Sequence, residues 1–154
     1  DLRKIYPDIE LHLIGSLQSN KVKTALKLFD VIQTIDRKSL VDTIIKESVK
    51  QDDIRCNRFF IQVNIGEEPQ KGGVFPENFN DLLEYIDKKI NITGLMCVPP
   101  TDFPPAPHFA LVHKLAKENS LHDLSMGMSD DYETAIRFGA NFVRIGTALF
   151  GARN

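Results

Sequence analysis

The sequence predicts a parallel α/β fold built from about six βα units. Short apolar runs of strand length alternate with longer amphipathic runs of helix length along the 154 residues. Strands that alternate with helices pair in parallel and are buried on both faces, so they are nearly continuously apolar. Glycines, hydroxyls and amides follow several of these apolar runs, where parallel folds carry their ligands.

The first three units follow one another directly. The run LHLI at 11–14 precedes a helical pattern over 19–29. The run VIQTI at 31–35 precedes a helix over 38–49, for which Asp36 or Ser39 is the expected N-cap. The run FFIQVNI at 59–65 precedes a helix over 76–88, and Pro76 suits its first turn.

Three further units complete the pattern. The run ITGLMCV at 92–98 leads, through a proline-rich loop over 99–107, to a helix over 107–118. A strand at 124–126 precedes a helix over 130–138, and Gly139 suits the end of that helix. The sixth strand is 142–145, and residues 148–154 begin a further helix.

Composition restricts the classes of function. A hydrophobic fraction of 42% and a net charge of -2 fit one domain over residues 1–154 with a real core. We expect no nucleic-acid partner because the chain has no basic block, and no membrane association because no apolar run approaches about 20 residues. The N-terminus does not resemble a signal peptide, so we expect a cytoplasmic protein. The cysteines, Cys56 and Cys97, and the four histidines lack metal-ligand spacing, and Cys97 is expected to be buried.

Two turns near the end of the chain predict an anion site. The run LSMGMSDD places the hydroxyl of Ser129 just after one strand, and FVRIGTALFGAR places Gly146 and Thr147 after the next. Bare N–H groups and hydroxyls at such strand ends hold a phosphate without a lysine. The alternative is structural: a plain Gly-Thr turn, and Ser129 as the N-cap of the following helix.

The number of units separates two parallel architectures. A closed parallel barrel typically has eight strands over roughly 250 residues. An open doubly wound sheet with a nucleotide site would carry GxGxxG or GxxxxGK[ST], and the sequence contains neither. The chain begins at Asp1 without a methionine. We therefore expect a barrel that lacks its first two units.

Several long runs resemble the pyridoxal phosphate homeostasis proteins, the YggS/PROSC family, whose fold is like the N-terminal barrel of alanine racemase. The runs are HLIGSLQSNKVK, FFIQVNIGEEPQKGG, GLMCVPP, PHFALVHKLA, LSMGMSDD and VRIGTALFGAR. The resemblance implies a TIM-type (β/α)8 barrel of the alanine racemase N-terminal type, with only about six βα units in this chain. The family's cofactor lysine, in a run like AVSK, and its GENY-like run have no counterpart here.

The resemblance implies a pyridoxal 5'-phosphate site without that Schiff-base lysine. The phosphate would lie on Ser129, Gly146 and Thr147. Arg144 would face the pyridine nitrogen and keep it unprotonated, which weakens the ring as an electron sink. For Arg144 alone, the alternative is an internal ion pair with a carboxylate of the barrel.

Four further residues surround this expected site. Ser125 and Met128 would line the pocket near the ring. His12 either points into the barrel near the cofactor or is a satisfied core residue, and the sequence favours neither. Lys71 lies in the loop after the third predicted strand. It is either a solvated cation or, if its loop folds inward, a lysine that could form a Schiff base with the cofactor in place of the missing one.

The function implied is pyridoxal phosphate binding in intracellular cofactor homeostasis, by a monomer that catalyses no reaction. Pyridoxal-phosphate-dependent apo-enzymes are the candidate recipients. One alternative is an amino-acid racemase-like enzyme, which the missing lysine disfavours. Another is a non-functional gene fragment, because two open barrel edges would leave it marginally stable. We expect the chain alone to bind the cofactor weakly.

Overall fold

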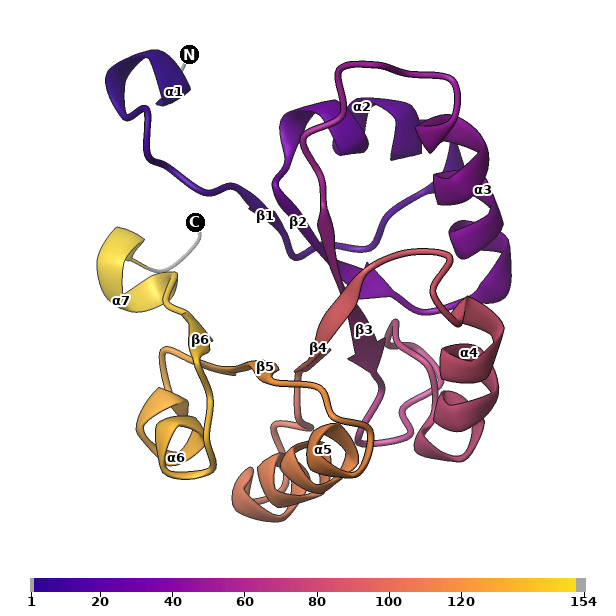
Figure 1. The fold of residues 1–154 in the computed structure, drawn as a ribbon. Coiled ribbons are helices and arrows are strands. Elements are labelled where there is room, and N and C mark those ends of the chain that lie inside the picture. Colours follow the sequence, from indigo (N-terminus) through magenta and orange to yellow (C-terminus); the bar gives the residue numbers. More distant parts are fainter. Residues whose placement is uncertain (1, 152–154) are drawn as a thin grey trace.

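The structure, a computed structural model, describes residues 2–151 and is centred on one sheet of six parallel strands (Figure 1). The strands are β1 (His12–Leu13), β2 (Val31–Ile35), β3 (Arg58–Val63), β4 (Ile92–Cys97), β5 (Asp123–Met128) and β6 (Phe142–Arg144). Their order in the sheet follows their order in the sequence. The sheet curls into a half-barrel with the helices outside (Figure 1), which confirms the expected barrel type with six units.

The helices lie where the amphipathic runs predicted them, with local differences. They are α1 (Leu2–Ile5), η1 (Ser19–Lys21), α2 (Val22–Leu28), α3 (Lys38–Ser48), η2 (Pro76–Asn78), α4 (Phe79–Ile86), α5 (Ala106–Glu118), α6 (Tyr132–Arg137) and α7 (Thr147–Phe150). The predicted helices at 19–29 and 76–88 each begin with a tighter 3₁₀ turn. The sequence did not predict α1, and residues 152–154 of the last predicted helix lie outside the described residues.

The predicted capping of α3 is wrong. Its N-cap is Arg37, whose side chain makes no capping hydrogen bond, and Ser39 lies inside the first turn. The Asp36 carboxylate instead accepts a 2.5 Å hydrogen bond from the Arg37 guanidinium. The Asp36 carboxylate is therefore engaged in an ion pair with the neighbouring side chain and does not cap the helix.

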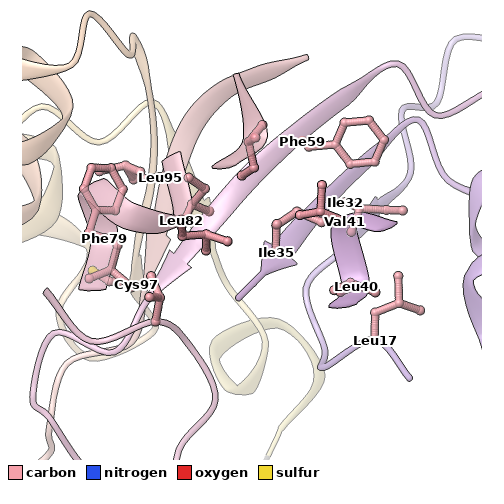
Figure 2. Close-up of a cluster of buried hydrophobic side chains, with 14 of the residues drawn as sticks. Leu17, Ile32, Ile35, Leu40, Val41, Phe59, Phe79, Leu82, Leu95 and Cys97 are labelled. Atoms are coloured by element: carbon pink, nitrogen blue, oxygen red, sulfur yellow. The ribbon is translucent and has the colours of Figure 1, made fainter. Parts of the chain in front are cut away.

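The main hydrophobic core lies between the convex face of the sheet and the helices. Phe79 on α4 and Phe109 on α5 are fully buried, as are Ile32 on β2 and Leu95 on β4. Figure 2 shows part of this layer, where side chains of the strands meet those of α3 and α4. Burying each such side chain contributes about 1.5–3 kcal/mol, so this layer fixes the strands to their helices.

A second, smaller core lies on the concave face. Val31, Phe60 and Met96 come from three neighbouring strands, are fully buried, and form a cluster separate from the main core. Phe142 of β6 covers them, with its ring centroid 5.6 Å from that of Phe60 in an edge-to-face arrangement. The Phe142 ring also lies 5.3 Å from the ring of His12 on β1. Side chains from the two edge strands of the sheet therefore meet across the concave face.

Both thiols are expected to be unreactive in the folded protein. Cys56 and Cys97 are free and buried, and burial raises the pKa of each to about 12. An exposed thiol ionises near pH 8.5, roughly, so the unfolded chain loses these protons first. Folding stability should therefore fall as the pH rises from about 9 towards 12. A disulfide reagent at pH 8 should label both cysteines in denaturant and neither in the native protein; rapid native labelling would contradict this.

Candidate functional site

The two turns predicted to bind an anion lie side by side at the carboxyl ends of β5 and β6. Ser129 follows β5, and Gly146 and Thr147 follow β6. The backbone N–H of Ala148 donates a 3.2 Å hydrogen bond to Ser129 Oγ. A hydroxyl that accepts a hydrogen bond keeps its own proton for donation. The second turn therefore holds the Ser129 hydroxyl in place as a donor.

The backbone around Gly146 is open to an approaching group. Gly146 and Thr147 are exposed. Within residues 2–151, no atom apart from Gly146 and its two chain neighbours lies within 4 Å of the place where a Cβ at position 146 would stand. A bare backbone with free space beside it lets a phosphate oxygen come close to N–H groups. The geometry of this turn suits an anion.

Asp131, and not Ser129 as predicted, is the N-cap residue of the helix that follows β5. The N-cap of α6 is Asp131, whose carboxylate accepts a 2.6 Å hydrogen bond from the N–H of Met128. Gly127 is buried with φ of +93°, and a Cβ there would stand 2.6 Å from Cβ of Ala135. The capping alternative for Ser129 is therefore wrong, and the hydroxyl faces the turn after β6 instead. The Met128 side chain lies at the rim, 46% exposed.

Arg144 points from β6 onto the concave face and is held by two neutral oxygens. Its Nη1 donates to Ser125 Oγ at 2.9 Å, and its Nη2 donates to the carbonyl oxygen of Cys97 at 2.7 Å. Ser125 is fully buried. Burial lowers the pKa of the Arg144 guanidinium, which nevertheless remains a cation at neutral pH. No ion pair to Arg144 is found within residues 2–151, so the carboxylate partner of the structural alternative is not present there.

The hydrogen bonding continues from Ser125 across the concave face. Ser125 Oγ donates to Gln33 Oε1 at 2.6 Å, and Gln33 Nε2 lies 2.7 Å from Nδ1 of His12. Nε2 of His12 lies 2.5 Å from the carboxylate of Glu10, which also accepts from Arg58. His12 therefore lies on the concave face with both ring nitrogens hydrogen-bonded, and its place near a cofactor stays a prediction.

Glu10 closes this row of side chains as an anion. The pKa of the Glu10 carboxyl lies below its ordinary value, chiefly because His12 hydrogen-bonds to it. The hydrogen bond and charge of Arg58 lower this pKa further, whereas burial opposes the shift. At neutral pH the carboxylate is therefore ionised and accepts hydrogen bonds only. The row runs from a cation, Arg144, to an anion, Glu10.

Sequence reasoning missed Gln33, Glu10 and Arg58. A signal for Gln33 was present, because it is the amide within the apolar run VIQTI at 31–35. A buried amide needs partners for its N–H and C=O groups, and Gln33 is 2% exposed. Glu10 lies before β1 and Arg58 begins β3, so their pairing depends on the curvature of the sheet.

None of the described strands offers a lysine that could form a Schiff base with a cofactor. The six described strands contain no lysine. Nζ of Lys71 lies 2.5 Å from the Glu68 carboxylate and 3.4 Å from the carbonyl oxygen of Pro99. Its ammonium is therefore engaged within the loops above β3 and β4.

Metal sites and membrane-spanning helices are both absent from residues 2–151. No group of three or more His, Cys, Asp and Glu side chains there is arranged to hold a metal ion. Over the same range, no helix is long and apolar enough to cross a bilayer.

The family profile described as the alanine racemase N-terminal domain matches residues 1–154. A curated relative from Aquifex aeolicus, named "Pyridoxal phosphate homeostasis protein", is 43% identical over 157 residues, covering 95% of this chain and 68% of the relative. The chain belongs to the pyridoxal phosphate homeostasis protein family. A family member from Pasteurella multocida is 39% identical over 95% of the chain and 67% of its own length. The chain thus spans about two thirds of these homeostasis proteins.

Solved structures agree with this membership. PipY of Synechococcus elongatus superposes with a TM-score of 0.84 at 30% identity without PLP, covering 94% of this chain and 72% of PipY. The PipY structure with PLP bound gives a TM-score of 0.82 at 29% identity, covering 97% of this chain and 74% of PipY. An alanine racemase of Clostridium difficile, at 14% identity and a TM-score of 0.72 over 99% of this chain and 42% of its own, shares the fold. The barrel type expected for this homeostasis family is confirmed.

Proposed function

We propose that this chain binds pyridoxal 5'-phosphate where β5 and β6 end, and that it serves cofactor homeostasis without catalysing a reaction. The observation that carries the proposal is the hydrogen bond from Ala148 N–H to Ser129 Oγ, which joins the two anion-binding turns. The names of the curated relatives and the PLP-bound structure of PipY support the choice of ligand.

The residues present fit the phosphate and ring of this cofactor. Ser129, Gly146 and Thr147 offer hydroxyls, backbone N–H groups and open space to the phosphate. Arg144 offers its remaining N–H groups to the ring nitrogen, beside a concave face that also carries Ser125 and His12. Met128 would cover the ring from the rim, where its side chain is exposed.

The proposed absence of catalysis is supported by what a catalytic site for this cofactor would need. The bound cofactor supplies an aldehyde and an electron sink, and enzymes that use it hold it on a lysine. The described strands carry no lysine, and a cation at the ring nitrogen opposes its protonation. We therefore favour reversible, noncovalent binding over the racemase-like alternative. We further propose a cytoplasmic monomer of one domain over residues 1–154, with pyridoxal-phosphate-dependent apo-enzymes as recipients.

Titration of the purified chain with pyridoxal 5'-phosphate tests this function. We expect weak, saturable binding that inorganic phosphate displaces, because both ligands compete for the same turns. After borohydride reduction, the intact mass should show no stoichiometric adduct. A stoichiometric adduct, on Lys71 above all, would overturn noncovalent binding, and absence of saturable binding would overturn the function and leave the non-functional fragment.

Gly146→Val is expected to raise the dissociation constant for pyridoxal 5'-phosphate at least about tenfold. Its side chain would fill the open space beside the turn, and losing one charge-assisted hydrogen bond already costs about that factor. Gly15→Val is the matched control, because Gly15 follows β1 and its Cβ position is equally open, with no described atom beyond its chain neighbours within 4 Å. Equilibrium dialysis gives both constants. Equal effects of the two variants would contradict a phosphate site at Gly146.

A further inference from the structure

Gln33 is the central member of the row of side chains on the concave face. It is 2% exposed, and its amide oxygen and nitrogen each have one side-chain partner, Ser125 and His12. Ser125 also accepts a hydrogen bond from Arg144, and His12 is hydrogen-bonded to Glu10. One buried amide thus lies between two groups of the proposed cofactor site.

The direction of every hydrogen bond in this row is fixed from its two ends. Arginine has only donors, so Ser125 Oγ accepts from Arg144. The Ser125 hydroxyl in turn donates its own proton to Gln33 Oε1. An ionised carboxylate has only acceptors, so His12 must carry a proton on Nε2 towards Glu10. The remaining nitrogen of a neutral imidazole, Nδ1, then accepts from Gln33 Nε2. Both ends select the same orientation of the Gln33 amide.

We propose that Gln33 is a positioning residue that orients both Arg144, through Ser125, and His12, to whose bare Nδ1 it donates. This inference rests on the proposed function only in that Arg144 and His12 flank the ring of the cofactor. The hydrogen-bond pattern itself is formed by side chains of this chain alone.

The side-chain chemistry explains why an amide occupies this position. Glutamine is a donor at one end and an acceptor at the other, as its two partners require. Methionine has nearly the same shape but offers neither group. Glutamate keeps an acceptor for Ser125 but has no N–H for Nδ1 of His12. The two variants therefore separate the two arms of the row.

The first measurement is made without the cofactor, by ¹⁵N NMR of the imidazole rings. The chain has four histidines, and loss of a signal in His12→Gln identifies His12. In the wild type, we expect a protonated Nε2 and a bare Nδ1. The bare Nδ1 pattern should be lost in Gln33→Glu, whose carboxylate can only accept and therefore draws a proton onto Nδ1. It should persist in Gln33→Met, where Glu10 still holds the proton on Nε2, and in Gln62→Met. Gln62 is the matched control because it lies on β3 and its amide donates to the Gly72 carbonyl.

The second measurement is the dissociation constant for pyridoxal 5'-phosphate. Gln33→Met should raise it about tenfold, and Gln33→Glu by a smaller factor because Ser125 keeps its acceptor. A wild-type His12 protonated on Nδ1, or an Nδ1 that stays bare in Gln33→Glu, would overturn the inference. An affinity loss in Gln33→Met no larger than in Gln62→Met would overturn it as well. Failure of the wild type to bind overturns the proposed function, whereas the NMR result still decides the role of Gln33.

Discussion

Phe60→Ala is expected to lower the free energy of unfolding by about 3–5 kcal/mol, the usual cost of emptying a buried phenylalanine site. Phe60 is fully buried in the concave-face cluster, and Phe142 of β6 packs edge-to-face on it. The cluster has few other members, so little is available to fill the space. Since most domains are stable by only about 5–15 kcal/mol, this one change should remove a large part of the total.

Urea unfolding followed by circular dichroism measures this loss. Phe103→Ala is the control, because Phe103 is 64% exposed and an exposed substitution usually changes stability by no more than about 0.5 kcal/mol. A loss below roughly 1 kcal/mol in Phe60→Ala would show that the concave-face core is not packed as described.

Arg144→Met is expected to weaken pyridoxal 5'-phosphate binding by roughly 10- to 100-fold. Hydrogen bonds to a charged group are worth about 1.5–3 kcal/mol, and the Arg144 guanidinium is the cation that the proposed site directs at the ring. The same change leaves the carbonyl oxygen of Cys97 without its donor, so stability should also fall, by about 1–3 kcal/mol.

The matched control for this second change is Arg137→Met. Arg137 lies in the last turn of α6 and is exposed, so neither affinity nor stability should change measurably. Fluorescence titration gives the affinities, and thermal unfolding shows that the variants are folded. An Arg144→Met variant that binds as tightly as Arg137→Met would remove Arg144 from the site.

The sequence predicted the fold well because strand periodicity and burial agree along this chain. The range 31–35 was predicted to the residue, since all its side chains are buried on one face or the other. The edges of the sheet were harder to predict. β1 has two residues where LHLI predicted four, because an edge strand pairs on one side only and has fewer partners.

The parts of the candidate site also differ in how far the sequence predicts them. The turns holding Ser129 and Gly146 are local patterns, and the structure places them in contact. The row through Gln33 joins residues up to 92 positions apart, and no spacing rule reports such pairs. A buried glutamine in the sequence predicts that its amide has hydrogen-bond partners. Which residues these partners are depends on how the sheet curves.

The agreement between spatial and sequence order in the sheet has a consequence for how the chain assembles. Paired residues are between 16 positions apart, as in Met128 with Arg144, and 34 apart, as in Gln62 with Met96. Each strand therefore finds its partner in the segment synthesised just before it. Pairing between neighbouring segments of the chain shortens the search for native contacts compared with pairing between distant ones. We therefore expect each βα unit to dock on the unit that precedes it in the sequence.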